Sequence, residues 1–294
     1  MDRVGDTWAP PSGSPVGGSG WHLGSDETWQ LVDHPPAPGF WLASDALWYP
    51  PEAATEPWRW SAWGFGEVWV GFAAYIAAGL VAVAIIAVVT GSAESADEIA
   101  PGALAVYVAA NAIAMVGTAS IATARKGLRS LRADFGLRGR WLDPLVGLGT
   151  GLAAVLVAGL VGAGIDRALG ADEPTSNIPV DAPSNATEFW VFFTAIAIVT
   201  PVVEELFFRG LVYRSFLKRG RGVWRAIVST TIIFVAPHLP VAESWNEAVS
   251  LLGSIGVLGL AFALACHWTA NRLAAPIVAH MVVNGLAAIA LYVG

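Results

Sequence analysis

The sequence predicts an all-α, polytopic membrane protein: a transmembrane helical bundle of about seven spans that follows a flexible N-terminal tail. Three observations lead to this prediction. Of the 294 residues, 55% are hydrophobic and 13% are charged, whereas soluble domains carry roughly 25% charged residues. The apolar residues gather in runs long enough to cross a hydrocarbon layer roughly 30 Å thick. Basic and acidic residues alternate between the loops that connect these runs.

Residues 1–64 form the predicted tail, which is rich in Trp, Pro and Gly. We find no helical or strand period in it. Residues 38–51 resemble short tryptophan- and proline-rich modules at the cytoplasmic ends of bacterial membrane proteins. We interpret the segment as a flexible cytoplasmic tail, with a peptide-binding or membrane-surface module as the alternative.

The candidate spans follow the tail. They are residues 68–89, 103–124, 144–165, 189–212, 224–239, 249–265 and 273–293. We divide them into residues 65–140, with two spans and a basic loop, and residues 141–294, which hold the others. On the third span, Gly147 and Gly151 form a Gly-x-x-x-Gly face, which favours close helix packing.

Loop charges predict the orientation of the chain. The loops after spans two, four and six contain Lys and Arg, while the alternate loops contain almost only acids, with Arg167 as the exception. Loops retained in the cytoplasm keep Lys and Arg, so we predict a cytoplasmic N-terminus and an external C-terminus. We expect the membrane to be that of a bacterial cell, as in the proteins that residues 38–51 resemble. No basic face suggests a nucleic-acid partner. Cys266 is the only cysteine, which excludes an intrachain disulfide.

A few ionisable side chains interrupt the spans. They are Glu204, Glu205 and Arg209 in the fourth span, His238 in the fifth and His280 in the seventh. A charge near the bilayer centre costs roughly 2.5–3.5 kcal/mol, so such groups face a polar cavity and pair. At a rise of roughly 1.5 Å per residue from the nearest basic loop, Glu204, His238 and His280 lie at similar depths. The three spans therefore predict one shared cavity.

Helical spacing assigns partners within this cluster. Glu205 and Arg209 are four residues apart and share one helix face, which predicts an ion pair. Glu204 is turned by about 100° from Glu205, so its carboxylate is free to face another group. His280 and Asn284 are also four apart and give the seventh span a polar stripe.

Glu204, His238 and His280 can activate water in two ways. The glutamate can act directly as a base paired with a histidine, or the imidazoles and the carboxylate can hold a divalent metal such as zinc. Asn284 offers an amide donor to the oxyanion of a tetrahedral intermediate. Both routes lead to acyl transfer to water. Pro237 and Pro240 should interrupt the fifth span around His238, as is tolerated beside a polar cavity.

Three motifs carry a family resemblance. Residues 204–209 (Glu-Glu-Leu-Phe-Phe-Arg), 234–238 (Phe-Val-Ala-Pro-His) and 280–284 (His-Met-Val-Val-Asn) resemble the EExxxR, FxxxH and HxxxN motifs of the CPBP or Abi family. These are CAAX prenyl protease type II-like intramembrane peptidases, and the resemblance covers roughly residues 140 to 294.

The resemblance implies a role for each residue of the three motifs. Glu204 would activate the hydrolytic water with His238, and His280 and Asn284 would stabilise the oxyanion or help to hold a metal. Glu205 and Arg209 would be supporting residues. Since the family has long been described as metalloproteases, the resemblance implies a metalloendopeptidase. Its substrate would be a membrane-associated peptide or protein, as in CAAX-box protein processing.

Two alternatives stay open at this point. In a non-enzymatic membrane scaffold or immunity protein of the same fold, the polar cluster would only order the helices. A transporter or proton relay could use the same buried acids, but it predicts inverted repeats, and we find no convincing internal symmetry. Asn111, in the second span, lies outside the three motifs, and we assign it to helix packing.

Overall fold

The computed structural model describes residues 57–90, 101–170, 182–220, 222–242 and 244–294, together with six short strands within the first 49 residues. The chain divides into two compact units, Met1–Ala62 and Trp63–Gly294.

The N-terminal unit contains three short antiparallel hairpins. They are β1 (Asp2–Val4) with β2 (Thr7–Ala9), β3 (Trp21–Leu23) with β4 (Trp29–Leu31), and β5 (Trp41–Leu42) with β6 (Trp48–Tyr49). Strands of two or three residues are too short to give the alternating pattern that predicts a strand, so the sequence carries no sign of them. The short 3-10 helix η1 (Pro57–Trp60) follows. The predicted flexibility of the tail concerns residues that mostly lie outside the described ones.

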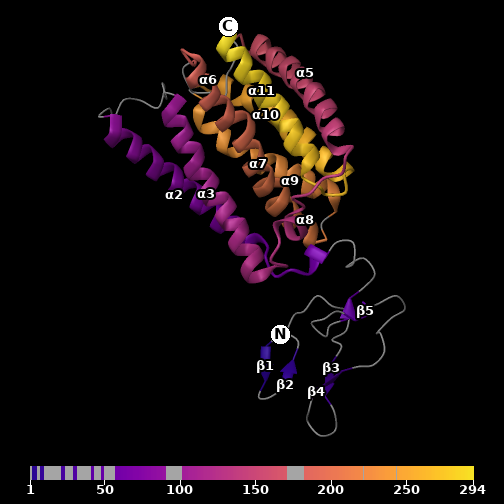
Figure 1. The fold of residues 1–294 in the computed structure, drawn as a ribbon. Coiled ribbons are helices and arrows are strands. Elements are labelled where there is room, and N and C mark those ends of the chain that lie inside the picture. The colour runs from indigo at the N-terminus through magenta and orange to yellow at the C-terminus, as the bar shows by residue number, and fades with distance from the viewer. Residues whose placement is uncertain are drawn as a thin grey trace. The chain divides into compact units, whose positions relative to one another are not determined.

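The described part of the second unit contains helices and no β-strand, and seven of its helices are long and apolar enough to cross a membrane (Figure 1). These spans are Phe65–Val89, Gly102–Lys126, Asp143–Leu169, Ala186–Lys218, Val223–Pro240, Trp245–Trp268 and Ala274–Val293. They confirm the predicted all-α bundle and the count of seven.

The spans are built from the following helices. The first three are α2 (Phe65–Thr90), α3 (Pro101–Lys126) and α5 (Asp143–Leu169), with the short α4 (Leu131–Phe135) between α3 and α5. The fourth combines α6 (Ala186–Phe193), η2 (Thr194–Val199), α7 (Thr200–Glu205), η3 (Leu206–Val212) and α8 (Tyr213–Lys218). The last three are α9 (Val223–Val235) with η4 (Ala236–Val241), α10 (Trp245–Trp268) and α11 (Ala274–Val293).

The fourth span is the inner helix of the bundle and is irregular around its two glutamates. Half of its most apolar window (50%) is buried, against 11% for the first span. The segments η2 and η3, on either side of α7, are π-helical, with the N–H of Thr200 bonded to the carbonyl of Ala195 five residues earlier. Such π-helical turns are rare and occur frequently at functional sites. The glutamates therefore lie on one regular turn between two widened ones.

The fourth span also extends beyond the predicted end at residue 212. The reason is that Arg214 is buried and its guanidinium donates to the backbone carbonyls of Asp134 (2.6 Å) and Asn271 (2.5 Å). Nearby, the indole N–H of Trp63 donates to the Asp134 carboxylate (2.8 Å), and Lys218 donates to the Trp63 carbonyl (2.6 Å). These bonds join the start of α2, α4 and the end of α8.

Close packing of α5 fixes the position of α11. α5 packs along α10 and α11 (Figure 1). A Cβ atom on Gly147 would lie 2.5 Å from the carbonyl oxygen of Ala275, and one on Gly151 would lie 2.7 Å from that of Ala279. Distances this short would force the helices apart, so the predicted role of this Gly-x-x-x-Gly face in packing is confirmed.

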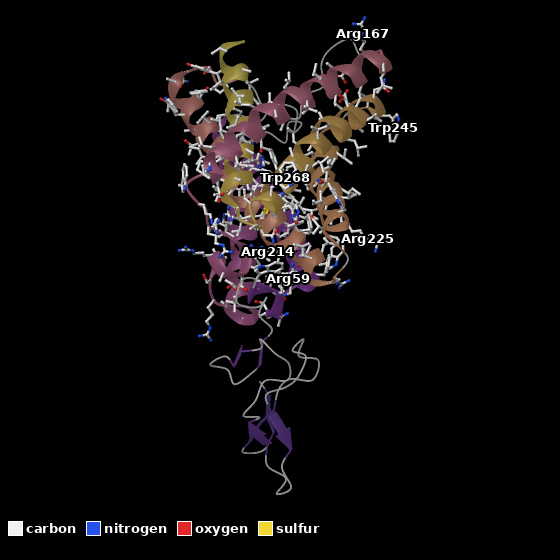
Figure 2. All side chains as sticks on the ribbon, turned by 90° about the vertical axis from the view of Figure 1, so that its right-hand side faces the viewer. Arg59, Arg167, Arg214, Arg225, Trp245 and Trp268 are labelled. Atoms are coloured by element: carbon white, nitrogen blue, oxygen red, sulfur yellow. The ribbon has the colours of Figure 1, made fainter. Side chains whose placement is uncertain are left out.

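Two further expectations concern the fifth span and the ends of the bundle. The predicted interruption around His238 is confirmed, because α9 changes there into the 3-10 helix η4. Figure 2 shows Arg167 and Trp245 toward one end of the helices and Arg225 toward the other. This is the arrangement expected for alternate loops on opposite membrane faces, and the side that faces the cytoplasm stays a prediction.

Candidate active site

A cavity of about 250 Å³ lies inside the helical unit. Its walls come from α2, α3, the fourth span, α9 with η4, α10 and α11, and they are mainly apolar. The structure brings the residues predicted as catalytic, Glu204, His238, His280 and Asn284, to this one cavity. The shared location of Glu204, His238 and His280 was predicted from depth, and that of Asn284 from its helical spacing to His280. The roles of all four in catalysis stay predictions.

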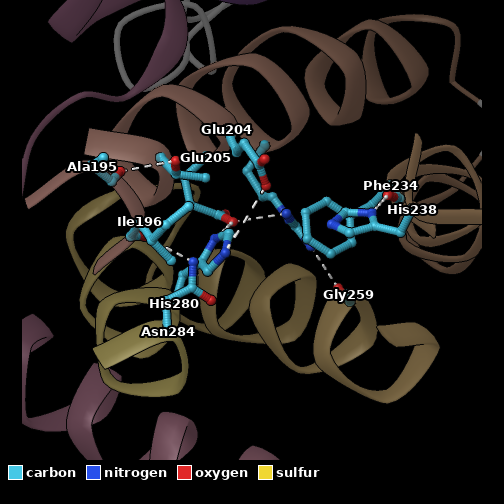
Figure 3. Close-up of polar contacts among 11 residues, drawn as sticks. Ala195, Ile196, Glu204, Glu205, Phe234, His238, Gly259, His280 and Asn284 are labelled. Atoms are coloured by element: carbon cyan, nitrogen blue, oxygen red, sulfur yellow. Dashed lines mark hydrogen bonds and ion pairs between the residues drawn. The ribbon is translucent and has the colours of Figure 1, made fainter. Parts of the chain in front are cut away.

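His280 lies between the two glutamates (Figure 3). Its Nδ1 is 3.1 Å from Oε1 of Glu205, and its Nε2 is 4.0 Å from Oε2 of Glu204. Neighbouring residues on a helix point about 100° apart, which lets the two carboxylates reach opposite nitrogens of one imidazole. An ionised carboxylate only accepts hydrogen bonds, so Nδ1 donates to Glu205. The Nε2 atom of His280 is thereby directed at Glu204.

Glu205 and Arg209 form the predicted buried ion pair. Both side chains are 0% exposed, and Nη1 of Arg209 donates to Oε1 of Glu205 at 2.8 Å. Nη2 donates to the carbonyl of Gly259 at 2.8 Å. The guanidinium carbon lies 4.4 Å from the ring centre of Phe234 and 5.4 Å from that of Phe262. Arg209 thus fixes Glu205, and Glu205 fixes His280, a second contact that the sequence analysis did not foresee.

His238 is held by its own helix. Its Nδ1 lies 3.0 Å from the carbonyl oxygen of Phe234 and donates to it, because a carbonyl only accepts. In an α-helix the backbone N–H of residue 238 would donate to this carbonyl. Because the chain changes to a 3-10 helix at Ala236, the carbonyl is available to the His238 side chain instead. A neutral imidazole protonated at Nδ1 keeps a lone pair on Nε2. The rings of His238 and His280 both pack against Phe234, with centroid distances of 5.2 and 5.9 Å.

Asn284 is anchored to the fourth span. Its Nδ2 donates to the carbonyl of Ile196 at 2.9 Å, within the π-helical η2 segment. A carboxamide nitrogen carries two hydrogens, so the second one is available to a ligand in the cavity. The bond also joins α11 to the helix that carries the two glutamates.

The described residues do not form a ready metal centre. No group of three or more His, Cys, Asp or Glu side chains in the described part of the chain is placed to hold a metal ion. Of the three predicted metal ligands, Glu204 and His280 approach each other. The donor set therefore does not fit a three-ligand site in this arrangement.

The fold and the cavity define an integral membrane protein with a polar site inside its helical bundle. Residues 186–286 match a family described as type II CAAX prenyl endopeptidase, Rce1-like. The chain therefore contains a domain of this peptidase family, and the family resemblance of the three motifs is confirmed. The match runs from α6 into α11 and includes Glu204, His238, His280 and Asn284. No curated protein and no solved structure matches the sequence.

Sequence reasoning missed the part of the cavity that α2 and α3 contribute. Tyr75, Tyr107, Asn111 and Met115 line it and lie outside the matched residues. None of them belongs to a motif, and neutral side chains in a span give a weaker signal than charged ones. The signal available was the polar carboxamide of Asn111, since amide side chains within spans usually face other helices or a cavity rather than lipid.

Proposed function

We propose that the protein is an intramembrane endopeptidase that hydrolyses a peptide bond in a membrane-associated peptide or protein. The observation that carries this proposal is the state of the Glu204 carboxylate. It lines the cavity, and its Oε2 atom is buried and has no hydrogen-bond partner among the described residues. A buried carboxylate oxygen without a hydrogen bond is costly inside a membrane and points to function.

The proposed reaction uses Glu204 as the general base. Glu204 takes a proton from a water molecule, and the water oxygen forms a bond to the carbonyl carbon of the substrate. His238, with its lone pair on Nε2, accepts a hydrogen bond from the same water. When the C–N bond of the tetrahedral intermediate breaks, Glu204 passes the proton to the leaving amine. The products are a carboxylic acid and an amine, so all atoms are accounted for.

His280 and Asn284 would stabilise the oxyanion of the tetrahedral intermediate. Protonated at both nitrogens, His280 donates from Nε2 while the Glu205 carboxylate, 3.1 Å from Nδ1, balances its charge. Nε2 of His280 lies 4.0 Å from Oε2 of Glu204, too far for a direct hydrogen bond. The tetrahedral intermediate carries two oxygens on one carbon. A gap of this size leaves room for one of them to face Glu204 and the other to face His280.

Activation of the water by a metal is the second route, and family membership is what supports it. The predicted ligands of a divalent ion such as zinc are Glu204, His238 and His280, which the described residues do not bring together as a three-ligand site. Metal analysis of the purified protein, together with hydrolysis assays after treatment with a chelator, separates the two routes. If Glu204 alone is the base, hydrolysis continues after the chelator treatment. Loss of hydrolysis that added zinc restores would assign the activation to a metal.

The test of the function is hydrolysis by the full chain in liposomes. The probes are internally quenched peptides with a farnesylated cysteine near the C-terminus. Because a general base contributes about 10²–10⁴-fold, we expect Glu204→Gln to lower kcat by at least about 100-fold. Glu188→Gln, on the same span but outside the cavity, is the matched control and should leave kcat unchanged. Equal turnover by wild type and Glu204→Gln would remove Glu204 from catalysis, whereas absence of turnover by wild type would favour a scaffold or immunity protein.

We also propose that the N-terminus lies in the cytoplasm and the C-terminus outside. The alternation of basic and acidic loops supports this orientation. The exposed residues Ser184 and Arg219 lie in loops predicted to be outside and inside, respectively, and the native Cys266 is buried. In intact cells a membrane-impermeant maleimide should label Ser184→Cys, and Arg219→Cys only after lysis. The reverse pattern would invert the orientation.

A further inference from the structure

The wall of the cavity outside the matched residues carries its own polar groups. α3 packs against α7, the helix that carries Glu204. Three polar side chains of α2 and α3 line the cavity: Tyr75, Tyr107 and Asn111. The two tyrosines form a side-chain hydrogen bond with each other, so each phenol has a partner within the protein. The carboxamide of Asn111 is different.

Asn111 presents an oriented acceptor. The residue is 7% exposed, and its Nδ2 donates to the backbone carbonyl of Tyr107 at 3.0 Å. A carbonyl accepts and never donates, so the amino side of the carboxamide must face Tyr107 and the oxygen must face away from it. That oxygen, Oδ1, is buried and has no hydrogen-bond partner in the described part of the chain. A buried acceptor without a partner raises the free energy of the empty site, and a ligand that brings a donor lowers it.

Two side-chain oxygens of this kind line the cavity among the described residues: Oε2 of Glu204 and Oδ1 of Asn111. Both only accept hydrogen bonds, so the molecules that enter must supply donors. The hydrolytic water supplies one to Glu204. A peptide supplies further donors, because every residue other than proline has a backbone N–H.

We propose that Asn111 is a substrate-positioning residue whose carboxamide oxygen accepts a hydrogen bond from a backbone N–H of the peptide substrate. The inference rests on the proposed function and deepens it: α3 recognises the peptide backbone, while the matched domain supplies the reacting groups. Recognition through the backbone is independent of the substrate's side chains. It fixes the position of the scissile bond relative to Glu204.

The test removes each half of the hydrogen bond in turn. The substrate is the farnesylated quenched peptide, in which one backbone N–H at a time, other than that of the scissile bond, is replaced by an ester oxygen. The enzyme variant is Asn111→Leu, which removes the acceptor at similar volume. Thr118→Val is the matched control, since Thr118 is also buried on α3 and bonds to its own helix, but lies outside the cavity.

In wild type, one ester position should lower kcat/KM by a factor of about 3 to 10, the worth of one hydrogen bond. Asn111→Leu should lower kcat/KM for the all-amide peptide by a similar factor, mainly through KM, and should no longer distinguish that ester from the amide. Thr118→Val should behave as wild type. If Asn111→Leu keeps the full ester penalty, or if no ester position matters in wild type, Asn111 binds water or only packs the helices.

The same data separate this inference from the function on which it rests. Turnover by wild type that Glu204→Gln abolishes supports the proposed peptidase, whatever Asn111 does. Absence of such turnover refutes both proposals. Turnover that depends on Glu204 but is the same in wild type and Asn111→Leu for every ester refutes the positioning role alone.

Discussion

The ion pair between Glu205 and Arg209 is the support on which His280 rests, and replacing either partner should be costly. Both side chains are 0% exposed and meet at 2.8 Å. In Glu205→Gln the guanidinium of Arg209 keeps its hydrogen bond to the carbonyl of Gly259 but loses the negative charge that balances its own. Since a lone charge within a membrane costs roughly 2.5–3.5 kcal/mol, we expect Glu205→Gln and Arg209→Met each to lower the free energy of unfolding by about 3 kcal/mol.

The double variant decides whether this loss comes from the pair. With both charges removed, no lone charge remains, so the loss should be smaller than that of either single variant and well below the sum of the two. The assay is equilibrium unfolding in mixed detergent micelles, followed by tryptophan fluorescence. Glu67→Gln is the contrast: its partner Lys126 is 52% exposed, so the loss should stay below about 1 kcal/mol. Additive losses in the double variant, or single losses like that of Glu67→Gln, would refute the reasoning.

The remaining predictions concern packing, the oxyanion and one ion pair. Gly151→Ala should destabilise the protein by about 1–3 kcal/mol through overpacking against α11. Gly149→Ala, with no described atom within 4 Å of its added Cβ, should be neutral in the same unfolding assay. Asn284→Ala should lower kcat by about 10²–10³-fold, the worth of one oxyanion donor, in the liposome assay. Asp143→Asn should cost about 1.5–3 kcal/mol of unfolding free energy, because Arg272 donates to this carboxylate twice at 2.7 Å.

Each of these predictions has an opposing result. Equal unfolding free energies for Gly151→Ala and Gly149→Ala would contradict the close approach of α5 and α11. Unchanged kcat in Asn284→Ala would confine Asn284 to its structural bond with Ile196. A neutral Asp143→Asn would mean that the pair with Arg272 does not hold the start of α5 to the loop before α11.

The helical architecture could be predicted from sequence because the membrane imposes it. Hydrocarbon requires every backbone polar group to be bonded within the protein, and apolar runs of about 20 residues meet this requirement as helices, so apolar runs and loop charges reveal the spans. The packing role of the Gly-x-x-x-Gly face could also be predicted from the sequence, since only glycine allows helix backbones to approach so closely. The end of the fourth span was not, because the sequence does not show that Arg214 is buried against backbone carbonyls.

The site could be predicted only in part. Ionisable side chains have a high free-energy cost inside a membrane, and their similar depths in three spans predicted that Glu204, His238 and His280 are neighbours. The position of His280 between two carboxylates was not foreseen, because it depends on how α7 and α11 pack. The π-helical turns beside α7 depart from the uniform 3.6-residue period on which the spacing argument rests. Asn111 was assigned to packing because nothing in its local sequence shows that α3 borders the cavity.

The most direct test of the central claim, that Glu204 activates water rather than attacking the substrate itself, is a single turnover in water enriched in ¹⁸O. Enzyme in excess over the quenched peptide cleaves it once, and mass spectrometry reads the isotope in the new carboxyl group. Activation of water predicts one ¹⁸O atom in the product of that first turnover. A product carrying only ¹⁶O would mean that the oxygen came from the Glu204 carboxylate, and would contradict the account.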